Sequence, residues 1–294
     1  FMEYDPAHCL PDDIDKLFTD KLHTALVLSV TTAQIEELAA RLESDERDFY
    51  LYPEVMEDDL KLARELLDTG RSSGVVIEGI QSRSGAADSQ FTQGGSVYQP
   101  LGVSASAKSA ITVYADGIPD GGTVTVYATQ FNAEVSAWQA SIGTLRNGRN
   151  VLTVPQLTSN SKMSKGGSLY VTYSGAGAEN IRLHVRRGVD IPALELADWY
   201  GLTELERREA IGAYVDELEA YLAATAMSTD ADWRNVTEIS TPVVLLSLPA
   251  KAVDGALGRS GREQRIDTLY DSILAWEDVM HICKTTQGID GTYE

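Results

Sequence analysis

The side chains that most often do chemistry in proteins are sparse in this 294-residue chain. Its four histidines are His8, His23, His184 and His281, and no two of them have the spacing of the His-Glu-x-x-His motif of zinc proteases. The sequence also contains no Gly-x-Ser-x-Gly nucleophile motif and no phosphate-binding P-loop. The residues alone therefore predict no catalytic residue and no metal ligand in this chain.

Two single side chains are candidates for other roles. Trp138 lies between two predicted strands, in "QFNAEVSAWQAS", where an aromatic ring can either stack on a sugar or pack within the fold. It is the candidate ligand-binding residue. His184 lies on the same face of a predicted strand as Arg182 and Arg186, and this pattern predicts an outward-facing surface side chain. The many carboxylates do not single out a pair for glycoside chemistry.

The charge of the chain limits its partners. It has 24 basic and 44 acidic residues, a net charge of −20, and no basic stripe. Such a charge opposes binding to a phosphate backbone or to an anionic lipid surface. We therefore expect no nucleic acid partner and no membrane insertion. The longest apolar run, 241–250, contains prolines and falls short of the ~20 residues that span a bilayer.

The two cysteines, Cys9 and Cys283, lie near opposite ends of the sequence. They can form one long-range disulfide or remain two thiols, and both states stay open at this point. No signal peptide is present, but Phe1 precedes Met2, so this absence does not argue against export.

Composition and periodicity predict three regions. Residues 1–74 show helical apolar spacing, with a capping box formed by Thr31 and Gln34 and a helix C-cap at Gly70. Residues 75–192 are rich in Gly, Ser, Thr and β-branched residues. Their short strands alternate with period two and have no helices between them, which predicts an antiparallel β-sandwich.

The alternation assigns side chains within this predicted sandwich. In "GGTVTVYAT" it places Val124, Val126 and Ala128 on one face. Asn147-Gly148 is typical of a turn between strands. The glycine-rich "GAGAEN", 175–180, is predicted to be a hairpin loop, because no helix follows it to offer a phosphate its N-terminus.

Residues 193–294 predict the beginning of another domain. Thr203 and Glu206 form a capping box for a helix, and "NVTEISTPVVLLSLPAKAV" follows as one predicted buried strand. The final helix carries more apolar residues than one isolated helix can bury. The pattern indicates an α/β or α+β domain whose remainder is not in this chain.

Taken in order, these segments resemble a known family, the M60-like (enhancin-type) zinc metallopeptidases. The resemblance covers roughly Val97 to Met280. Five segments, by their order and spacing, resemble the family's non-catalytic β-sandwich: "SVYQPLGVSASAKSAITVYADG", "GGTVTVYATQFN", "LRNGRNVLTVPQL", "KGGSLYVTYSG" and "IRLHVRRGVDIPALEL". Three later segments are similar to the start of the family's catalytic region: the helix "TELERREAIGAYVDELEAYL", the strand "NVTEISTPVVLLSLPAKAV" and the tryptophan-bearing helix "LYDSILAWEDVM".

The resemblance implies an α+β multidomain chain: an N-terminal helical segment, an antiparallel β-sandwich, and the first helices and strand of an α/β-type metallopeptidase domain. It implies secreted or cell-surface bacterial enzymes that cleave glycoproteins such as mucins with a zinc ion held by His-Glu-x-x-His and a downstream glutamate. This sequence departs from that pattern because the motif is absent. The expectation is therefore a non-catalytic, inactive N-terminal portion, with zinc and the remainder of the peptidase chain belonging to a longer parent.

An alternative explains the missing motif without truncation. The chain would then be a stand-alone carbohydrate- or glycoprotein-binding sandwich, adhesin-like and without catalytic activity. Loss of glycan binding on Trp138→Ala would support a sugar site on the sandwich under either hypothesis.

Overall fold

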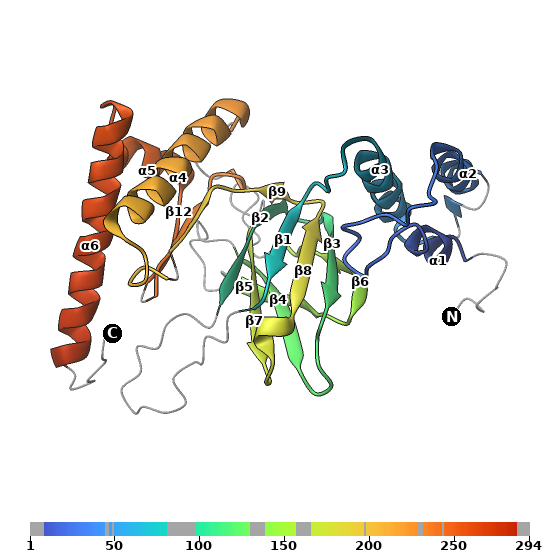
Figure 1. Ribbon diagram of the computed structural model, residues 1–294, viewed down its shortest axis with the longest axis horizontal. Helices are drawn as coiled ribbons and strands as arrows, with labels where there is room; N and C mark the ends of the chain where they lie inside the picture. Colours follow the sequence, from blue (N-terminus) through green and yellow to red (C-terminus); the bar gives the residue numbers. More distant parts are fainter. Residues whose placement is uncertain are drawn as a thin grey trace.

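The computed structural model describes residues 9–44, 47–48, 50–80, 98–129, 139–156, 166–196, 198–227, 232–242 and 244–286. Trp138, the candidate ligand-binding residue, lies outside the described residues. The fold is α+β, as expected, with helices at both ends of the chain and strands between them (Figure 1).

Three helices form an N-terminal unit: α1 (Leu10–Asp15), α2 (Thr32–Glu43) and α3 (Pro53–Thr69). The predicted capping box at Thr31 and Gln34 is confirmed, and Gly70 ends α3 in the left-handed conformation with φ of 68°. The apolar stripes of these helices pack on one another around Leu10, Ile35 and Leu62, which are all fully buried.

The predicted antiparallel sandwich is confirmed. One sheet has four strands in the order β1-β8-β3-β6, the other has five in the order β5-β4-β7-β2-β9, and every pairing within them is antiparallel. The strands are β1 (Val75–Glu78), β2 (Gln99–Ser106), β3 (Ala110–Asp116), β4 (Thr123–Thr129), β5 (Gln139–Thr144), β6 (Gly148–Thr153), β7 (Gly166–Ser174), β8 (Arg182–Arg186) and β9 (Val189–Asp190).

The core of the sandwich follows the predicted alternation. Val124, Val126 and Ala128 of β4 all face inward, at most 1% exposed. The segment 175–180 is not the hairpin loop that the sequence predicts. It contains a 3₁₀ turn, Ala178–Asn180, and connects β7 of the five-stranded sheet to β8 of the other sheet. Local alternation cannot distinguish a hairpin from such a crossing, because both join two amphipathic strands.

The last part of the described chain forms a C-terminal unit of three strands and three helices. These are β10 (Ala193–Glu195), α4 (Glu204–Ala224), β11 (Thr237–Ser240), β12 (Leu245–Leu248), α5 (Ala250–Leu257) and α6 (Arg262–Thr286). The capping box at Thr203 and Glu206 is confirmed. The single predicted strand is wrong: the segment forms the antiparallel pair β11–β12 and the helix α5, because Pro242 interrupts the apolar run at a turn.

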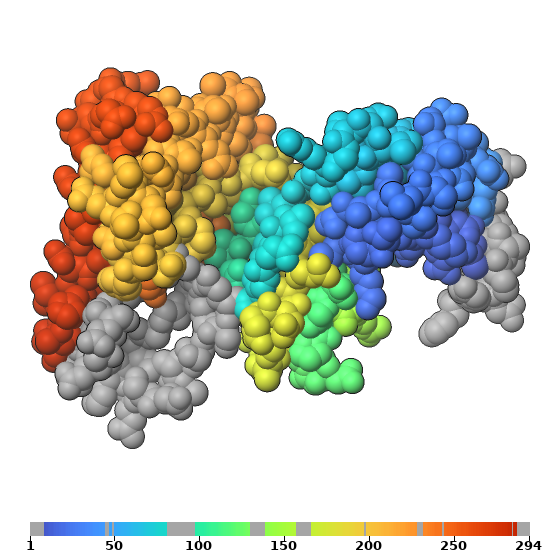
Figure 2. Space-filling model, viewed as in Figure 1, coloured from blue at the N-terminus to red at the C-terminus, as the bar shows by residue number. Residues whose placement is uncertain are grey.

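The sandwich lies between the two helical units. The N-terminal unit contacts the four-stranded sheet, and the C-terminal unit contacts the five-stranded sheet (Figures 1 and 2). Both outer faces of the sandwich are therefore partly covered. None of the described helices is long and apolar enough to cross a bilayer.

Candidate functional site: two polar junctions of the sandwich

The first junction joins the N-terminal unit to the outer face of the four-stranded sheet, and it corrects the prediction for His184. This side chain faces away from the sandwich core, as the alternation predicts, but it is fully buried and not on the surface. Its Nδ1 lies 2.6 Å from the Leu22 carbonyl oxygen, and its Nε2 lies 2.9 Å from that of Ser73. Alternation along β8 identifies the face of the sheet, but only tertiary packing shows that helices cover it.

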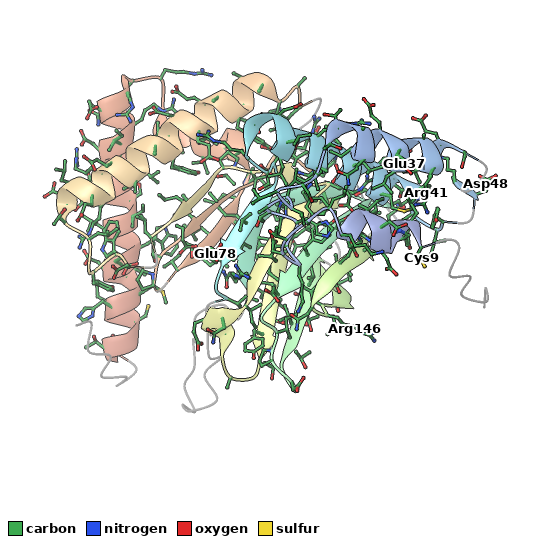
Figure 3. The ribbon with its side chains drawn as sticks, turned by 45° about the vertical axis from the view of Figure 1, so that its right-hand side comes forward. Cys9, Glu37, Arg41, Asp48, Glu78 and Arg146 are labelled. Carbon is green, nitrogen blue, oxygen red and sulfur yellow. The ribbon has the colours of Figure 1, made fainter. Side chains whose placement is uncertain are left out.

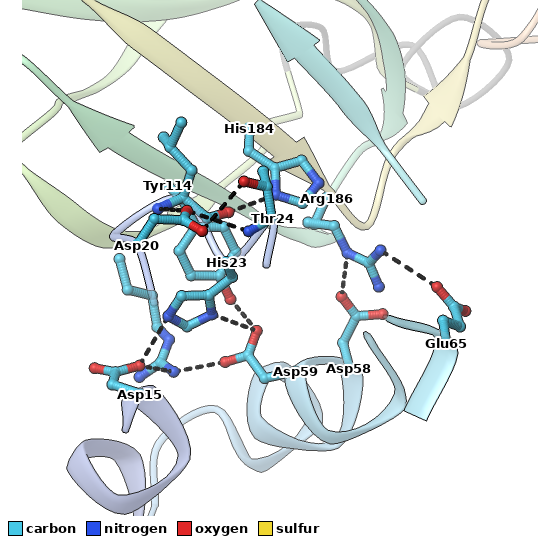
Figure 4. Close-up of polar contacts among 12 residues, drawn as sticks. Asp15, Asp20, His23, Thr24, Asp58, Asp59, Glu65, Tyr114, His184 and Arg186 are labelled. Atoms are coloured by element: carbon cyan, nitrogen blue, oxygen red, sulfur yellow. Dashed lines mark hydrogen bonds and ion pairs between the residues drawn. The ribbon is translucent and has the colours of Figure 1, made fainter. Parts of the chain in front are cut away.

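A group of charged side chains occupies the centre of this junction (Figure 4). Asp59 of α3 is fully buried and accepts hydrogen bonds from the Tyr114 hydroxyl and from Arg149 Nη2, the latter at 2.6 Å. Arg149 also donates to Asp15 at 2.5 Å. His23, 3% exposed and with φ of 56°, completes the group with Nε2 3.2 Å from Asp15 Oδ1. These five residues define the charged junction.

The charges of this group compensate one another. Burial alone raises the pKa of Asp59, but the adjacent His23 and Arg149 outweigh it and the pKa is lowered. Burial likewise disfavours the protonated imidazole, but Asp15 and Asp59 outweigh it and raise the pKa of His23. The His23 ring is held between Phe18, 3.9 Å away between centroids, and Tyr114, 4.2 Å away.

This arrangement of paired charges is better suited to holding the N-terminal helices on the sheet than to catalysis. The two carboxylates already have the Arg149 guanidinium between them, which neutralises the charge that would attract a metal ion. Within the described residues no group of three or more His, Cys, Asp and Glu side chains is arranged to hold a metal. The charged junction fixes the helices to the sheet.

The second junction joins the C-terminal unit to the outer face of the five-stranded sheet. Glu238 of β11 is 1% exposed and accepts a hydrogen bond from the Tyr170 hydroxyl of β7, which also contacts the Ser247 hydroxyl. Ser104 of β2 adds a bond to the Trp233 carbonyl oxygen at 2.5 Å. We call Tyr170, Glu238 and Ser247 the carboxyl junction.

Burial raises the pKa of Glu238 to about 7, because the hydrogen bonds from Tyr170 and Ser247 only partly offset the lost hydration. A carboxyl group with such a pKa is suited to proton transfer near neutral pH. However, the side chain lies between two packed units and has no exposed surface on which to meet a substrate. Sequence periodicity gives no sign of Glu238, because its strand reads as uniformly buried.

The remaining candidates from the sequence lie apart from these junctions. Cys9 precedes α1 at the far end of the N-terminal unit, whereas Cys283 is in α6 at the opposite end of the molecule (Figures 1 and 3). No disulfide joins them. His281 is also in α6, so the structure does not bring it near His23 or His184.

The final helix has two different halves. In its first half Ile266, Leu269 and Ile273 are buried in the core of the C-terminal unit. In its second half Trp276 is 47% exposed, Val279 47% and Ile282 63%. Spacings of three residues place these three side chains along neighbouring turns, and together they form an exposed apolar strip.

Several known structures are similar to this chain. A metallopeptidase from Bacteroides thetaiotaomicron matches 94% of this chain and 41% of its own, with a TM-score of 0.58 and 18% identity. The M60 catalytic domain of ZmpC from Clostridium perfringens, in complex with the sialyl T antigen, matches 61% of this chain and 35% of its own, with a TM-score of 0.44 and 20% identity. The catalytic module of the metalloprotease ZmpA from the same organism matches 62% of this chain and 36% of its own, with a TM-score of 0.43 and 19% identity.

The match to the Bacteroides protein shows that this chain shares its fold with part of that metallopeptidase, and the α+β fold class expected from the sequence is confirmed. The chain spans about two fifths of that protein's length. No protein-family model matches the sequence, and no curated protein matches it.

Proposed function

We propose that this chain is the non-catalytic portion of a secreted, M60-like zinc metallopeptidase that acts on glycosylated proteins such as mucins. The observation that supports this most is the fold shared with a metallopeptidase over 94% of this chain, with only 41% of that larger protein matched. In this proposal the zinc ion and its ligands belong to the part of the peptidase beyond the matched region.

The exposed apolar strip of α6 supports the same proposal. Trp276, Val279 and Ile282 form a surface that a packed domain ordinarily buries. At roughly 25 cal/mol per Å² of apolar area, covering three such side chains stabilises an association by a few kcal/mol. The partner proposed for this strip is the remainder of the peptidase chain.

The test has two parts. The gene is sequenced beyond the codon for Glu294, where we expect a His-Glu-x-x-His motif followed by a glutamate. The present chain and a chain extended through that motif are then dialysed against a weak chelator and compared for bound zinc and for cleavage of a mucin. We expect both properties in the extended chain alone. Stoichiometric zinc on the present chain would contradict the proposal.

A second candidate function, glycan binding by the sandwich itself, rests on the tyrosines of the five-stranded sheet. Tyr98 and Tyr127 are half-buried, and their rings meet edge to face at 5.2 Å between centroids. Rigid aromatic rings at a partly open sheet face suit stacking on a sugar. Trp138 directly precedes β5 in the sequence and remains a predicted member of such a site.

Glycan-array binding tests this second function. We expect Tyr127→Ala and Trp138→Ala each to lower binding at least about fivefold, as loss of a stacking aromatic predicts. Tyr200→Ala, which removes an exposed tyrosine of the C-terminal unit, is the control. Wild-type binding by both sandwich variants would contradict a sugar site on this face.

A further inference from the structure

A charged pocket lies beside the charged junction and takes no part in the proposed function. Its volume is about 340 Å³, and it lies between α3, the connection through Ser73 and Gly74, and the turn from β8 into β9. Gly74 has φ of 102°, and a Cβ atom there would lie 2.7 Å from the Val185 carbonyl oxygen. Only glycine allows the connection to approach β8 this closely at the wall of the pocket.

The ionised groups that line this pocket do not all neutralise one another. Arg186 Nε donates to Asp58 at 3.0 Å, so these two charges cancel. The other charged side chains of the lining are Lys61, Arg187 and Asp190. Glu65 lies 3.8 Å from Arg186 Nη1 and 4.0 Å from Lys61 Nζ, so the carboxylates at the pocket equal the cations in number. Arg187 is the cation that forms no ion pair with the described residues.

Arg187 is the best-defined cation of the pocket. It has φ of 69°, a conformation that residues other than glycine seldom adopt and that the surrounding structure must hold in place. Its Nε donates to the Ala110 carbonyl oxygen at 3.2 Å and its Nη1 to that of Glu54 at 2.7 Å. Within the described residues, Arg187 has no carboxylate partner, and its Nη2 makes no hydrogen bond. A guanidinium held by neutral groups retains its charge for a planar anion.

Lys61 and Asp190 complete the recognition chemistry. The Lys61 side chain is 72% exposed, and its ammonium group lies 4.0 Å from Glu65, so it is able to turn toward an anion. Partial burial raises the pKa of Asp190, although Arg186 and His184 oppose this effect. The Asp190 side chain makes no hydrogen bond or ion pair with the described residues, and a hydroxyl group would supply a donor. Among the described residues that line the pocket there is no aromatic side chain on which a neutral sugar ring could stack.

We propose that this pocket binds a small organic carboxylate that also carries hydroxyl groups, with its carboxylate on Arg187 and Lys61 and a hydroxyl donated to Asp190. The volume is that of pockets for small ligands. Two sources share this chemistry: an acidic sugar of a glycan and a free hydroxy acid. The pocket would serve either one whether or not the chain is part of a peptidase.

Isothermal titration calorimetry of the whole chain with sodium galacturonate, galactose and sodium lactate tests the proposal. We expect galacturonate to bind at least about tenfold more tightly than galactose, which has the same ring without the carboxylate. Lactate binding as tight as that of galacturonate would support a free hydroxy acid, and weaker lactate binding would support an acidic sugar. Failure of both carboxylates to bind, or equal binding of galactose, would overturn the proposal.

Variants locate the binding. Lys61→Gln is expected to weaken galacturonate binding at least about threefold, with recovery in Lys61→Arg, because an exposed charge contributes modestly. Lys16→Gln removes a lysine of equal exposure, 73%, elsewhere on the N-terminal unit and is the matched control. Arg187→Lys keeps the charge but loses the planar fork, and we expect about tenfold weaker binding. Wild-type affinity in both Lys61→Gln and Arg187→Lys would place the ligand elsewhere.

Discussion

The charged junction and the carboxyl junction bury the same chemical group in opposite electrostatic settings. Asp59 and Glu238 are at most 1% exposed, and each accepts a hydrogen bond from a tyrosine of the sandwich. The pKa of Asp59 is nevertheless lowered, whereas that of Glu238 is raised to about 7. The difference is the cation: Arg149 and His23 face Asp59, whereas the described groups that face Glu238 include no cation.

From the opposite pKa shifts of Asp59 and Glu238 we expect the two helical units to respond differently to pH. A buried carboxylate with a paired cation stays ionised and holds its junction together at neutral pH. A buried carboxyl group without a paired cation favours its protonated, neutral form. The N-terminal unit is therefore attached by charge, and the C-terminal unit by a group that ionises close to neutrality.

The largest expected effect comes from removing the anion of the charged junction. Asp59→Asn leaves Arg149 and His23 buried beside a neutral amide, and we expect the free energy of unfolding to fall by about 3–5 kcal/mol. Urea unfolding followed by circular dichroism measures this change. Asp13→Asn, which breaks ion pairs of Lys16 and Arg41 in the same unit, is the control and should cost less than about 1 kcal/mol. Equal costs would mean that the buried group has no special role.

The carboxyl junction should respond in the opposite direction. Because the pKa of Glu238 is raised from 4.5 to about 7, the folded state binds the proton more tightly, and stability falls as pH rises from about 4.5 to 7. Glu238→Gln cannot ionise, so we expect it to be more stable than wild type by about 3 kcal/mol at pH 8, with little change at pH 4.5.

Urea unfolding at the two pH values checks this prediction, with Glu204→Gln as the exposed control. An equal effect of Glu238→Gln at both pH values would show that ionisation of Glu238 is not the cause.

The two tyrosines that donate to these carboxyl groups, Tyr114 and Tyr170, should differ in the same way. At pH 7, Tyr114→Phe removes a donor from an ionised carboxylate, and we expect a loss of about 2 kcal/mol. Tyr170→Phe removes a donor from Glu238, so its cost should be lower at pH 5, where that group is protonated, than at pH 8. Thermal unfolding at both pH values measures the two effects. A pH-independent cost in Tyr170→Phe would argue against the assigned protonation of Glu238.

The smallest expected effect concerns His23. Because the pKa of His23 is raised, the stability that its protonated form contributes is fully present below pH 6.5. It is lost as the pH rises through the pKa of His23 in the folded state. A titration of the His23 ring protons by NMR should give a midpoint above that of an unfolded peptide. Asp15→Asn should lower this midpoint, because Asp15 is the carboxylate nearest to Nε2. An unchanged midpoint would show that Asp15 does not raise the pKa of His23.

Much of the secondary structure could be predicted because it depends on local rules. The capping boxes at Thr31 and Thr203 require only a residue and its neighbour three positions later, and both are present. The inward side chains of β4 follow from the two-residue period of a strand. The crossing at 175–180 and the break of the 235–253 segment into two strands and a helix depend on which strands pair, which local patterns do not encode.

Local sequence patterns specify the helical caps, the two faces of each strand and the high apolar content of α6. What covers those faces depends on tertiary packing. His184 and Tyr170 both point outward from the sandwich, yet the N-terminal unit buries His184 and the C-terminal unit buries Tyr170. Asp59 and Arg149 are 90 residues apart, and only packing brings them to 2.6 Å. The pKa values, junctions and pockets depend on pairs of residues that are far apart in the sequence. They could therefore not be predicted from the sequence alone.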